Sequence, residues 1–527
     1  MSRENPTNPA LRDEIIAALE QPFGSFTDIL TAWARAQPDA IALADDRRDI
    51  AWAELIGLVE RLAARLVETG LERGQSVAIL GTSTVEYALV FLAAVRAGGV
   101  AAPLTTSASP GQLKGMIVDS GARHLFIDAT KAQELGSDFM AETIRVPLEE
   151  IEGWMAPPGS RAPDFAPDKG DAFNIIYSSG TTGVPKGIIH SHAMRWRQFG
   201  STGISYLKSG LDVRALASTP LYSNTTMVAF LAPLLAGGTV RIMGKFDCAR
   251  WLEHASRDRT TLTMLVPVQY QRLMDFPGFG EFDLSALALK YCTSAPFPAE
   301  LKREVLDRMP GALIEIYSMT EGGVVCLLAC HEFPEKLHTV GRPAPGSEIK
   351  VLDDDDNEVP AGTPGNLVGR SQTMMSGYKN RPEKTAETQW TDPATGDIWM
   401  RMGDIGRVDE DGFVELVGRA KDMIISGGFN IYPSDLEAEL ERESAVVEAA
   451  VVGIASRQWG ETPVGFVVLR DSDDADCDRV LGVVNARMGK TQRLSALFAI
   501  DEMPRSHIGK LLKTELRERA ETLMASQ

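Results

Sequence analysis

The segment from Tyr177 to Gly187 constrains this chain more than any other. It reads Tyr-Ser-Ser-Gly-Thr-Thr-Gly-Val-Pro-Lys-Gly and follows an apolar stretch, 172–177, that predicts a strand. Its glycines let backbone N–H groups approach phosphate oxygens, its hydroxyls donate further bonds, and Lys186 supplies a cation, so the segment suits a polyanion. A Walker loop is excluded, because Gly187 follows the lysine. Gly-Thr-Thr-Gly taken alone would instead indicate a solvated loop.

Length, charge and cysteine spacing narrow the class of protein. The chain has 527 residues, which exceeds one ordinary core, so two or more domains are expected. Its net charge of −19 argues against a nucleic-acid partner or an anionic membrane surface. Five cysteines without paired spacing favour a reduced cytoplasm, and the polar start, broken by Pro6 and Pro9, predicts no signal peptide. The best apolar run, 227–235, is too short to span a bilayer.

Alternating helical and strand patterns predict an α/β fold whose parallel sheets are covered by helices on both faces. Residues 25–70 carry helical periodicity, and 84–97 predict another helix. The expected strands are 76–80, 100–104, 124–128, 239–243, 262–267, 290–294, 313–318, 348–352, 366–370, 446–452 and 464–469. The proline-rich stretch 153–170 predicts a surface connector. A capping box from Ser434 to Glu437 predicts a helix over 435–442.

Two further polar segments each lie at the end of a predicted strand. They are Thr293-Ser294-Ala295-Pro296 and Tyr317-Ser318-Met319-Thr320-Glu321. Ligands of a parallel sheet bind outside the carboxyl ends of its strands, so both segments are expected to face the phosphate loop. In the second segment a ring can stack on adenine, a threonine can bond a phosphate, and a glutamate can hold magnesium. A helix N-terminus capped by Thr320 explains that segment equally well.

Two clusters with metal-ligand chemistry favour structural interpretations. Cys326, Cys330 and His331 stand among apolar residues that predict a buried strand. The four aspartates of 353–356 predict a solvated hairpin turn, because the spacing and the glycine of a calcium loop are missing. Neither cluster predicts a metal centre.

The phosphate loop and the Tyr317–Glu321 segment together closely resemble signatures of the acyl-adenylate-forming superfamily, which contains acyl-CoA synthetases, luciferases and peptide-synthetase adenylation domains. The resemblance assigns Tyr317 to the adenine, Thr320 to the α-phosphate and Glu321 to magnesium. Ser318 replaces a glycine that lies against the acyl group in the family, which narrows the pocket or adds a polar contact.

The resemblance also implies a domain organisation. A large N-terminal domain of parallel sheets covered by helices, with a small β-barrel, is expected over 1–418, in subdomains of about 1–171, 172–345 and 346–418. A small, mobile α+β domain is expected over 419–527. Lys421 occupies the hinge position of the family, which implies two arrangements of the C-terminal domain.

Four later motifs resemble the remaining signatures and follow in the expected order. Two of them would bind the ribose: Asp404, which follows Met402-Gly403, and Arg419, which follows Gly418. The Asp404 carboxylate can accept hydrogen bonds from both ribose hydroxyls. A turn with a capping aspartate is the alternative for Gly-Asp-Ile-Gly. The terminal run 504–510 implies that Lys510 bridges the attacking carboxylate and the α-phosphate, a contact of about 3–4 kcal/mol in the transition state. Gly427 and Gly428 resemble the segment that lines the pantetheine tunnel.

The resemblance, carried over position by position, gives a complete nucleotide site. The nucleotide-binding residues are Ser178, Ser179, Gly180, Thr181, Thr182, Gly183, Lys186, Ser294, Ala295, Pro296, Tyr317, Asp404 and Arg419. The catalytic residues are Lys510, Glu321 and Thr320, and Glu321 is the metal ligand.

The acyl pocket departs most from the family pattern. Residues 220–226 resemble a motif of the form P-L-[FY]-H, with Ser223 where histidine is common. The inferred lining is Tyr222, Ser223, Asn224, Val268, Gln269 and Ser318. Its mixed polarity favours an aromatic or a short to medium aliphatic acid over a very long chain. His190 and His192 are expected to serve local hydrogen bonds rather than to touch ligand.

The motifs therefore predict an AMP-forming carboxylate–CoA ligase with ATP and CoA as substrates and Mg²⁺ as cofactor. One alternative is an adenylating enzyme that loads a separate carrier protein. Another is a non-catalytic acyl- or nucleotide-binding regulator, which the retention of Lys510 and Glu321 disfavours.

Overall fold

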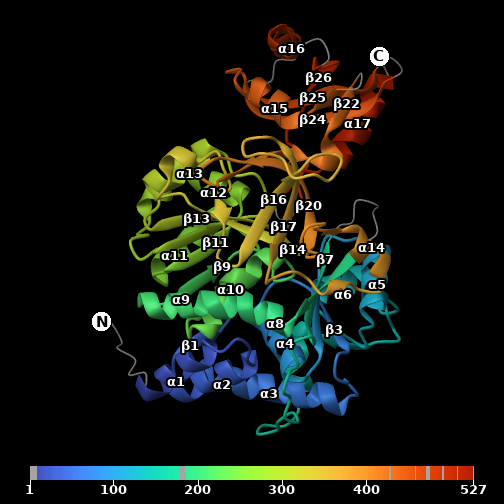
Figure 1. Cartoon of the computed structure of the whole chain (residues 1–527). Coiled ribbons are helices and arrows are strands. Elements are labelled where there is room, and N and C mark those ends of the chain that lie inside the picture. The colour runs from blue at the N-terminus through green and yellow to red at the C-terminus, as the bar shows by residue number, and fades with distance from the viewer. Residues whose placement is uncertain are drawn as a thin grey trace. The chain divides into compact units, whose positions relative to one another are not determined.

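Strands and helices alternate along the N-terminal part of the chain, and short strands dominate afterwards (Figure 1). The computed structural model describes residues 9–178, 185–426, 429–456, 459–470, 475–488, 492–506 and 509–525. The chain divides into two compact units. The first comprises 1–325, 329–337 and 370–389, and the second comprises 326–328, 338–369 and 390–527.

One sheet of the first unit carries the strand that leads into the phosphate loop. Its strand order is β18-β8-β7-β4-β3-β5-β6, parallel from β7 to β6 and antiparallel from β7 to β18. Every residue of β3 and β4 is buried, as expected for a parallel sheet covered on both faces. The bounds are β3 (Ser76–Leu80), β4 (Val100–Leu104), β5 (His124–Ile127), β6 (Ile144–Pro147), β7 (Ala172–Ser178), β8 (Lys186–Ser191) and β18 (Gly377–Tyr378).

A second sheet has the order β15-β14-β13-β12-β11-β9-β10-β1-β2 and is parallel from β13 to β1. Its strands are β1 (Ile41–Ala44), β2 (Asp49–Ala51), β9 (Arg214–Ala217), β10 (Thr239–Ile242), β11 (Leu262–Leu265), β12 (Leu289–Cys292), β13 (Ala312–Met319), β14 (Gly322–Ala329) and β15 (Arg342–Pro343). The antiparallel pair β1 and β2 interrupts the region 25–70 that was expected to be helical. Strands of three and four residues are too short for periodicity to separate them from the helices on either side.

Amphipathic helices bury their apolar faces against both sheets. One hydrophobic cluster takes Phe26 from α2, Val77 from β3, Ala215 from β9 and Phe230 from α10. Helix α10 lies against both α2 and α9 there (Figure 1). The helices are α1 (Pro9–Leu19), α2 (Phe26–Ala36), α3 (Trp52–Glu68), α4 (Val85–Arg96), α5 (Pro110–Ser120), α6 (Ala129–Leu135), α7 (Ile151–Trp154), α8 (His192–Arg195), α9 (Ser201–Ser209), α10 (Met227–Leu235), α11 (Cys248–Arg257), α12 (Pro267–Met274), α13 (Ala299–Arg308) and α14 (Pro382–Glu387).

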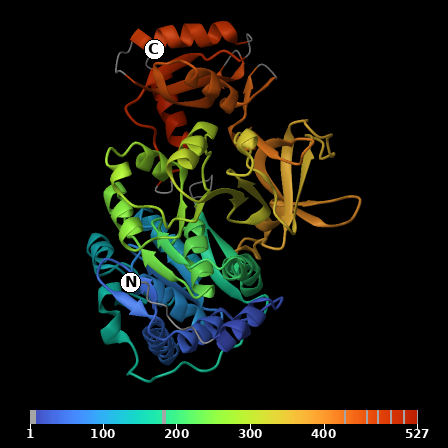
Figure 2. The ribbon, with the colours of Figure 1, turned by 90° about the vertical axis from the view of Figure 1, so that its left-hand side faces the viewer.

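The second unit is built on two five-stranded sheets. In the first, drawn in yellow and orange in Figure 2, the order is β16-β17-β20-β19 and β21 pairs with β20. In the second, the order is β23-β22-β25-β24 and β26 pairs with β25. The strands are β16 (Ser347–Leu352), β17 (Gly365–Ser371), β19 (Gln389–Thr391), β20 (Ile398–Val408), β21 (Val414–Arg419), β22 (Ile424–Ser426), β23 (Phe429–Ile431), β24 (Val446–Ser456), β25 (Gly460–Leu469) and β26 (Ala496–Ala499).

Helices cover both faces of the C-terminal sheet. Val451 and Val452 are neighbours on β24, and they belong to different hydrophobic clusters because successive side chains of a strand point to opposite faces. Leu440 joins the first cluster and Leu516 joins the second. The helices are α15 (Pro433–Glu441), α16 (Ala475–Arg487) and α17 (Lys513–Ala525).

The capping box predicted for α15 is wrong. The helix begins at Pro433, and its N-cap Tyr432 makes no side-chain cap. The Ser434 hydroxyl donates to the carbonyl of Val417, and Glu437 accepts from the N–H of Val451 at 2.8 Å. Proline suits the first helical position, which places Ser434 two residues past the cap position and frees both side chains for tertiary partners.

Candidate active site

The phosphate-loop segment connects the two strands of a β-hairpin. β7 and β8 pair antiparallel, with Ser178 opposite Lys186 and Tyr177 opposite Gly187. β7 also pairs with β4, so the hairpin is anchored in the parallel sheet. Five residues predicted to bind the nucleotide lie outside the described residues, namely Ser179, Gly180, Thr181, Thr182 and Gly183. Ser178 and Lys186 mark the two ends of the loop.

The Tyr317–Glu321 segment ends β13 and turns directly into β14. Gly322 has a φ of +96°, and a Cβ there would lie 2.4 Å from the carbonyl oxygen of Thr373. Only glycine allows this close approach, and it brings the Glu321 carbonyl within 2.8 Å of the Met375 N–H that donates to it. Thr320 lies in a turn between two strands, so the alternative of a helix N-terminus capped by Thr320 is wrong.

The loop lysine and Glu321 meet at a residue that the sequence did not single out. The Lys186 ammonium lies 5.1 Å from the centre of the Tyr378 ring. The Tyr378 hydroxyl donates to Glu321 Oε1 at 2.8 Å, and the Tyr378 side chain belongs to β18, the neighbour of β8. Burial and the Glu321 carboxylate raise the pKa of Tyr378, so the phenol keeps its proton and acts as the donor.

A buried network ties the hairpin to the backbone of Thr320. His190 Nε2 lies 2.8 Å from the Thr320 carbonyl oxygen, and His190 Nδ1 lies 2.9 Å from the Arg195 guanidinium, which also donates to Asn174 at 2.9 Å. A guanidinium only donates, so Nδ1 accepts and Nε2 carries the proton given to Thr320. Burial and Arg195 lower the pKa of His190 well below its usual value, which keeps the ring neutral. His192 differs from expectation, because its two buried ring nitrogens have no hydrogen-bond partner in the described part of the chain.

The Thr293–Pro296 segment follows β12, the neighbour of β13. The Thr293 hydroxyl donates to the carbonyl of Ile316 at 2.6 Å, which ties the ends of the two strands together. Ser294 has a φ of +83°, a left-handed conformation that non-glycine residues rarely adopt. Its hydroxyl lies 2.5 Å from that of Thr225. A residue predicted to bind nucleotide therefore contacts the loop predicted to line the acyl pocket. Ala295 is half-buried and Pro296 is exposed.

Some of the predicted acyl-pocket side chains make hydrogen bonds within the protein, and the others could contact a ligand. Gln269 accepts from the N–H of Val266 at 3.1 Å and donates to the Ser218 carbonyl at 3.3 Å, so its amide holds the start of α12. Ser223 caps the 3₁₀ turn that follows, by accepting from the N–H of Thr225 at 3.3 Å. Asn224 Oδ1 is buried and has no hydrogen-bond partner among the described residues. Partly exposed side chains complete the set, namely Tyr222, Val268 and Ser318.

Asp404 and Arg419 lie directly opposite each other on β20 and β21. The Arg419 Nε lies 3.4 Å from Asp404 Oδ1. Asp404 belongs to a strand, so the alternative of a turn with a capping aspartate is wrong. The strand pairing presents a carboxylate and a guanidinium together, which is the arrangement that a ribose diol can bridge.

Lys510 stands on a short, closed turn near the C-terminus. Its N–H donates to the Ser506 hydroxyl at 3.1 Å, its carbonyl accepts from the Ser506 N–H at 2.8 Å, and Gly509 supplies a φ of +76°. Arg505 braces the turn by donating to the Gly509 carbonyl at 2.7 Å and pairing with Glu448 of β24. The Lys510 side chain is exposed.

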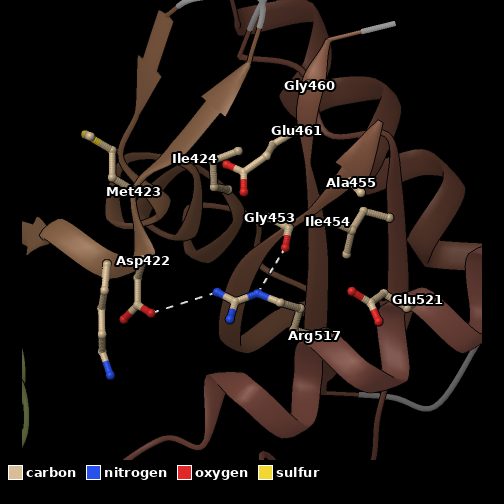
Figure 3. Close-up of a pocket in the computed structure, with 11 residues that line it drawn as sticks. Asp422, Met423, Ile424, Gly453, Ile454, Ala455, Gly460, Glu461, Arg517 and Glu521 are labelled. Carbon is tan, nitrogen blue, oxygen red and sulfur yellow. Dashed lines mark hydrogen bonds and ion pairs between the residues drawn. The ribbon is translucent and has the colours of Figure 1, made fainter. Parts of the chain in front are cut away.

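A cavity of about 450 Å³ lies beside the predicted hinge, in the second unit (Figure 3). Arg517 spans one side of it, with its Nε donating to the Gly453 carbonyl at 3.1 Å and a terminal nitrogen 4.0 Å from Asp422 Oδ1. Of the described residues predicted to contact ligand or form the hinge, only Lys421 lines this cavity. Gly427 and Gly428 lie outside the described residues.

Within the described ranges, no group of three or more His, Cys, Asp or Glu side chains could hold a metal ion. Cys326 and Cys330 are buried, in β14 and just after it, as predicted. Asp353 closes the acidic turn by accepting from the N–H groups of Asp355 and Asn357. None of the described helices is long and apolar enough to cross a membrane.

Two family models and several relatives match the chain. The model described as AMP-binding enzyme covers residues 30–379, and that described as AMP-binding enzyme C-terminal domain covers 435–510. Feruloyl-CoA synthase of an Amycolatopsis species is 34% identical, over 92% of this chain and 97% of that protein. Indoleacetate–CoA ligase of Aromatoleum aromaticum is 31% identical, over 92% and 96% respectively. 4-Coumarate–CoA ligase 5 of Oryza sativa subsp. japonica is 30% identical, over 92% and 95%.

Solved structures agree with these matches. ATP-bound MatB from Rhodopseudomonas palustris has a TM-score of 0.81 and 27% identity, over 94% of this chain and 98% of that chain. These findings confirm the resemblance to the acyl-adenylate-forming superfamily and the expected α/β fold. By its sequence and its fold, the chain belongs to the family of AMP-binding enzymes.

Proposed function

We propose that this chain is an ATP-dependent carboxylate–CoA ligase. The observation that carries the proposal is the meeting of Lys186 and Glu321 at Tyr378, which gathers a cation and a carboxylate at the end of the phosphate loop. Similarity to acid–CoA ligases along almost the whole chain supports it. A carboxylate oxygen of the acid attacks the α-phosphorus of ATP, and the bond to pyrophosphate breaks. The CoA thiolate then attacks the acyl carbonyl and AMP leaves, so no protein nucleophile is needed.

Glu321 fits a magnesium ligand. One carboxylate oxygen accepts the Tyr378 hydroxyl, and the other makes no hydrogen bond within the described residues. Mg²⁺ prefers hard carboxylate oxygens, usually together with substrate phosphates. When bound, it supplies charge neutralisation on the phosphates, while Lys186 contributes a second positive charge and Thr320 a hydrogen bond to the α-phosphate.

The remaining roles follow the family pattern. Tyr317 stacks on the adenine, and Asp404 with Arg419 binds the ribose hydroxyls. Lys510 offers its ammonium to the carboxylate and the α-phosphate during adenylation. The segment 419–527 acts as a domain that turns about Lys421, after which Gly427 and Gly428 line the path of the CoA arm.

The acid is of medium size and aromatic, with a hydrogen-bond donor on its ring. Asn224 Oδ1 is a buried acceptor without a partner among the described residues, and a ring hydroxyl or N–H would satisfy it. Tyr222 and Val268 add apolar surface around it. The names of the relatives point the same way, since feruloyl, indoleacetate and coumarate groups all carry such a donor on an aromatic ring.

The first experiment is a panel of carboxylic acids tested for exchange of labelled pyrophosphate into ATP and for AMP release with CoA. We expect both activities, with hydroxylated aromatic acids ahead of their unsubstituted parents. Exchange without CoA consumption would favour carrier loading, and no exchange with any acid would favour a non-catalytic binding protein. Equal rates with and without the ring hydroxyl would overturn the assignment of Asn224.

Gly428→Leu is expected to slow acyl transfer to CoA by about tenfold or more while leaving pyrophosphate exchange near that of the wild type. A side chain at this position would obstruct a thin ligand that passes close to the backbone. Rates of thioester formation from supplied acyl-AMP, set against exchange rates on the same preparation, check the prediction. Equal losses in the two half-reactions would contradict the role of Gly428 in the CoA path.

Ser294→Gly is expected to shift selectivity toward bulkier acids by about tenfold or more in kcat/KM. The substitution removes the hydroxyl that contacts Thr225 and relieves a left-handed serine, so stability should change by less than about 1 kcal/mol. Thr225→Val is the control, because it keeps the volume and loses only the hydrogen bond. An unchanged order of acids in the glycine variant would show that Ser294 does not limit the pocket.

A further inference from the structure

We propose that Tyr378 is a positioning residue for adenylation, which orients the Glu321 carboxylate toward magnesium and holds the Lys186 ammonium at the phosphate loop. The inference rests on the proposed function, because it assumes that Glu321 binds the metal of ATP. Tyr378 does not itself contact the reacting atoms in this assignment. It acts through the two charged groups that its hydroxyl and its ring contact.

The backbone around Tyr378 is fixed on two sides. On one side, Tyr378 pairs with Ile188 of β8, and the N–H of Lys379 donates to the Gly187 carbonyl at 2.7 Å. On the other side, the N–H of Met375 donates to the Glu321 carbonyl at 2.8 Å. The segment 375–379 therefore joins the end of the phosphate hairpin to the β13–β14 turn, and Tyr378 lies between them.

The hydroxyl of Tyr378 selects one orientation of Glu321. It is a donor toward a carboxylate, and the Tyr378 residue is only 7% exposed, so water competes little for this bond. Occupying Oε1 leaves Oε2 for a cation. A carboxylate on a free side chain would have to lose rotamer entropy on binding the metal, whereas here that cost is met on folding.

The ring of Tyr378 holds Lys186 without neutralising it. At 5.1 Å from the ring centre, the ammonium is within range of a cation–π contact. No carboxylate forms an ion pair with Lys186 among the described residues, so its full charge stays available for phosphate oxygens. A carboxylate in place of the ring would hold the lysine more strongly but would compete with the nucleotide.

Two substitutions separate the two contacts. Tyr378→Phe removes the hydroxyl and keeps the ring, and Tyr378→Leu removes both. The probe is α,β-methylene ATP, whose Kd is measured by calorimetry in Mg²⁺ and in EDTA. The Kd ratio is the Kd in EDTA divided by the Kd in Mg²⁺, so it is large when the metal strengthens binding. The phenylalanine variant is expected to lower this ratio by about tenfold or more, with the Kd in EDTA unchanged. The leucine variant should also weaken binding in EDTA by about two- to tenfold, because Lys186 loses its ring.

Tyr206→Phe is the matched control, since Tyr206 is a buried tyrosine whose hydroxyl donates to that of Tyr291, away from Glu321. It should leave the Kd ratio at the wild-type value. Glu321→Gln adds a second measurement. It should lower the Kd ratio strongly in the otherwise wild-type protein but only slightly in the Tyr378→Phe variant, because both substitutions remove the same metal contact. Additive effects, or an equal loss in Tyr206→Phe, would overturn the proposal.

The outcome also separates this inference from the proposed function. A wild-type Kd ratio near one would remove the metal role of Glu321 and with it the basis of the inference. A large wild-type ratio that Tyr378→Phe leaves unchanged would overturn the role of Tyr378 alone. Absence of pyrophosphate exchange with every acid would overturn the ligase assignment, whatever the Kd values are.

Discussion

The Lys510→Ala variant is expected to lose acid-dependent pyrophosphate exchange by two to three orders of magnitude while largely keeping thioester formation from supplied acyl-AMP. Adenylation brings the carboxylate of the acid against the α-phosphate and builds negative charge on its oxygens. A bridging ammonium in that transition state is worth on the order of 3–4 kcal/mol. In the second half-reaction the acid is already joined to the α-phosphate as a mixed anhydride, so no ammonium is needed to bring the two anions together.

The turn that carries Lys510 should survive the substitution, because its hydrogen bonds to Ser506 use only the Lys510 backbone. Lys513→Ala is the matched control: this nearby lysine pairs with Glu437 at 2.6 Å, and its removal should change neither half-reaction by more than about twofold. Equal damage to both half-reactions in Lys510→Ala would contradict the role of that lysine.

Lys302→Met is expected to destabilise the first unit by about 3–5 kcal/mol. Lys302 of α13 and Glu315 of β13 form an ion pair at 2.5 Å, with 2% and 6% of their side chains exposed. Lys302 also donates to the Leu337 carbonyl at 2.7 Å. Removing the ammonium leaves a carboxylate without its counter-charge in the core, and the melting temperature should fall by about 5 °C or more.

The loss of folding stability caused by Lys302→Met should grow as the pH rises. Burial raises the pKa of Glu315 to about 7, against the opposing effect of Lys302, from an ordinary value of 4.5. Without the lysine the folded-state pKa rises further. The folded state then binds the proton more tightly than the unfolded state, so stability is retained below about pH 4.5 and is lost as pH rises through the folded-state pKa.

Melting curves at pH 5.5 and pH 8 check this dependence, and the larger difference from wild type is expected at pH 8. The double variant Lys302→Met, Glu315→Gln removes both charges and should recover at least half of the loss. A double variant as unstable as the single one would show that lost packing, rather than the unpaired charge, sets the cost.

Sequence patterns located the main elements of the fold with good accuracy. The strands expected at 76–80 and 100–104 have the same bounds as β3 and β4. Long apolar runs and clear helical periods carry enough information locally, because burial on both faces of a parallel sheet leaves only apolar residues. The hairpin of β1 and β2 was missed, since strands this short have no period to detect.

Local signals failed where tertiary partners compete for the same side chain. Ser434 and Glu437 have the spacing of a capping box, but they bond Val417 and Val451 instead. Gln269 was expected to face the acid, whereas its amide is engaged with Val266 and Ser218. A side-chain amide or carboxylate has several possible partners, and the sequence does not reveal which of them the fold brings within reach.

The sequence by itself determined the family, and it predicted the site, because the phosphate loop, Glu321, Asp404 and Lys510 occur as short motifs whose residue types suit phosphate, metal and ribose contacts. Only the tertiary structure decided that Tyr378 joins Lys186 to Glu321. Tyr378 lies 192 residues after Lys186 and 57 residues after Glu321 in the sequence. The three residues meet because of strand pairing and the close backbone approach at Gly322. Such contacts are absent from any local pattern, because pairing partners are chosen by the folded chain as a whole.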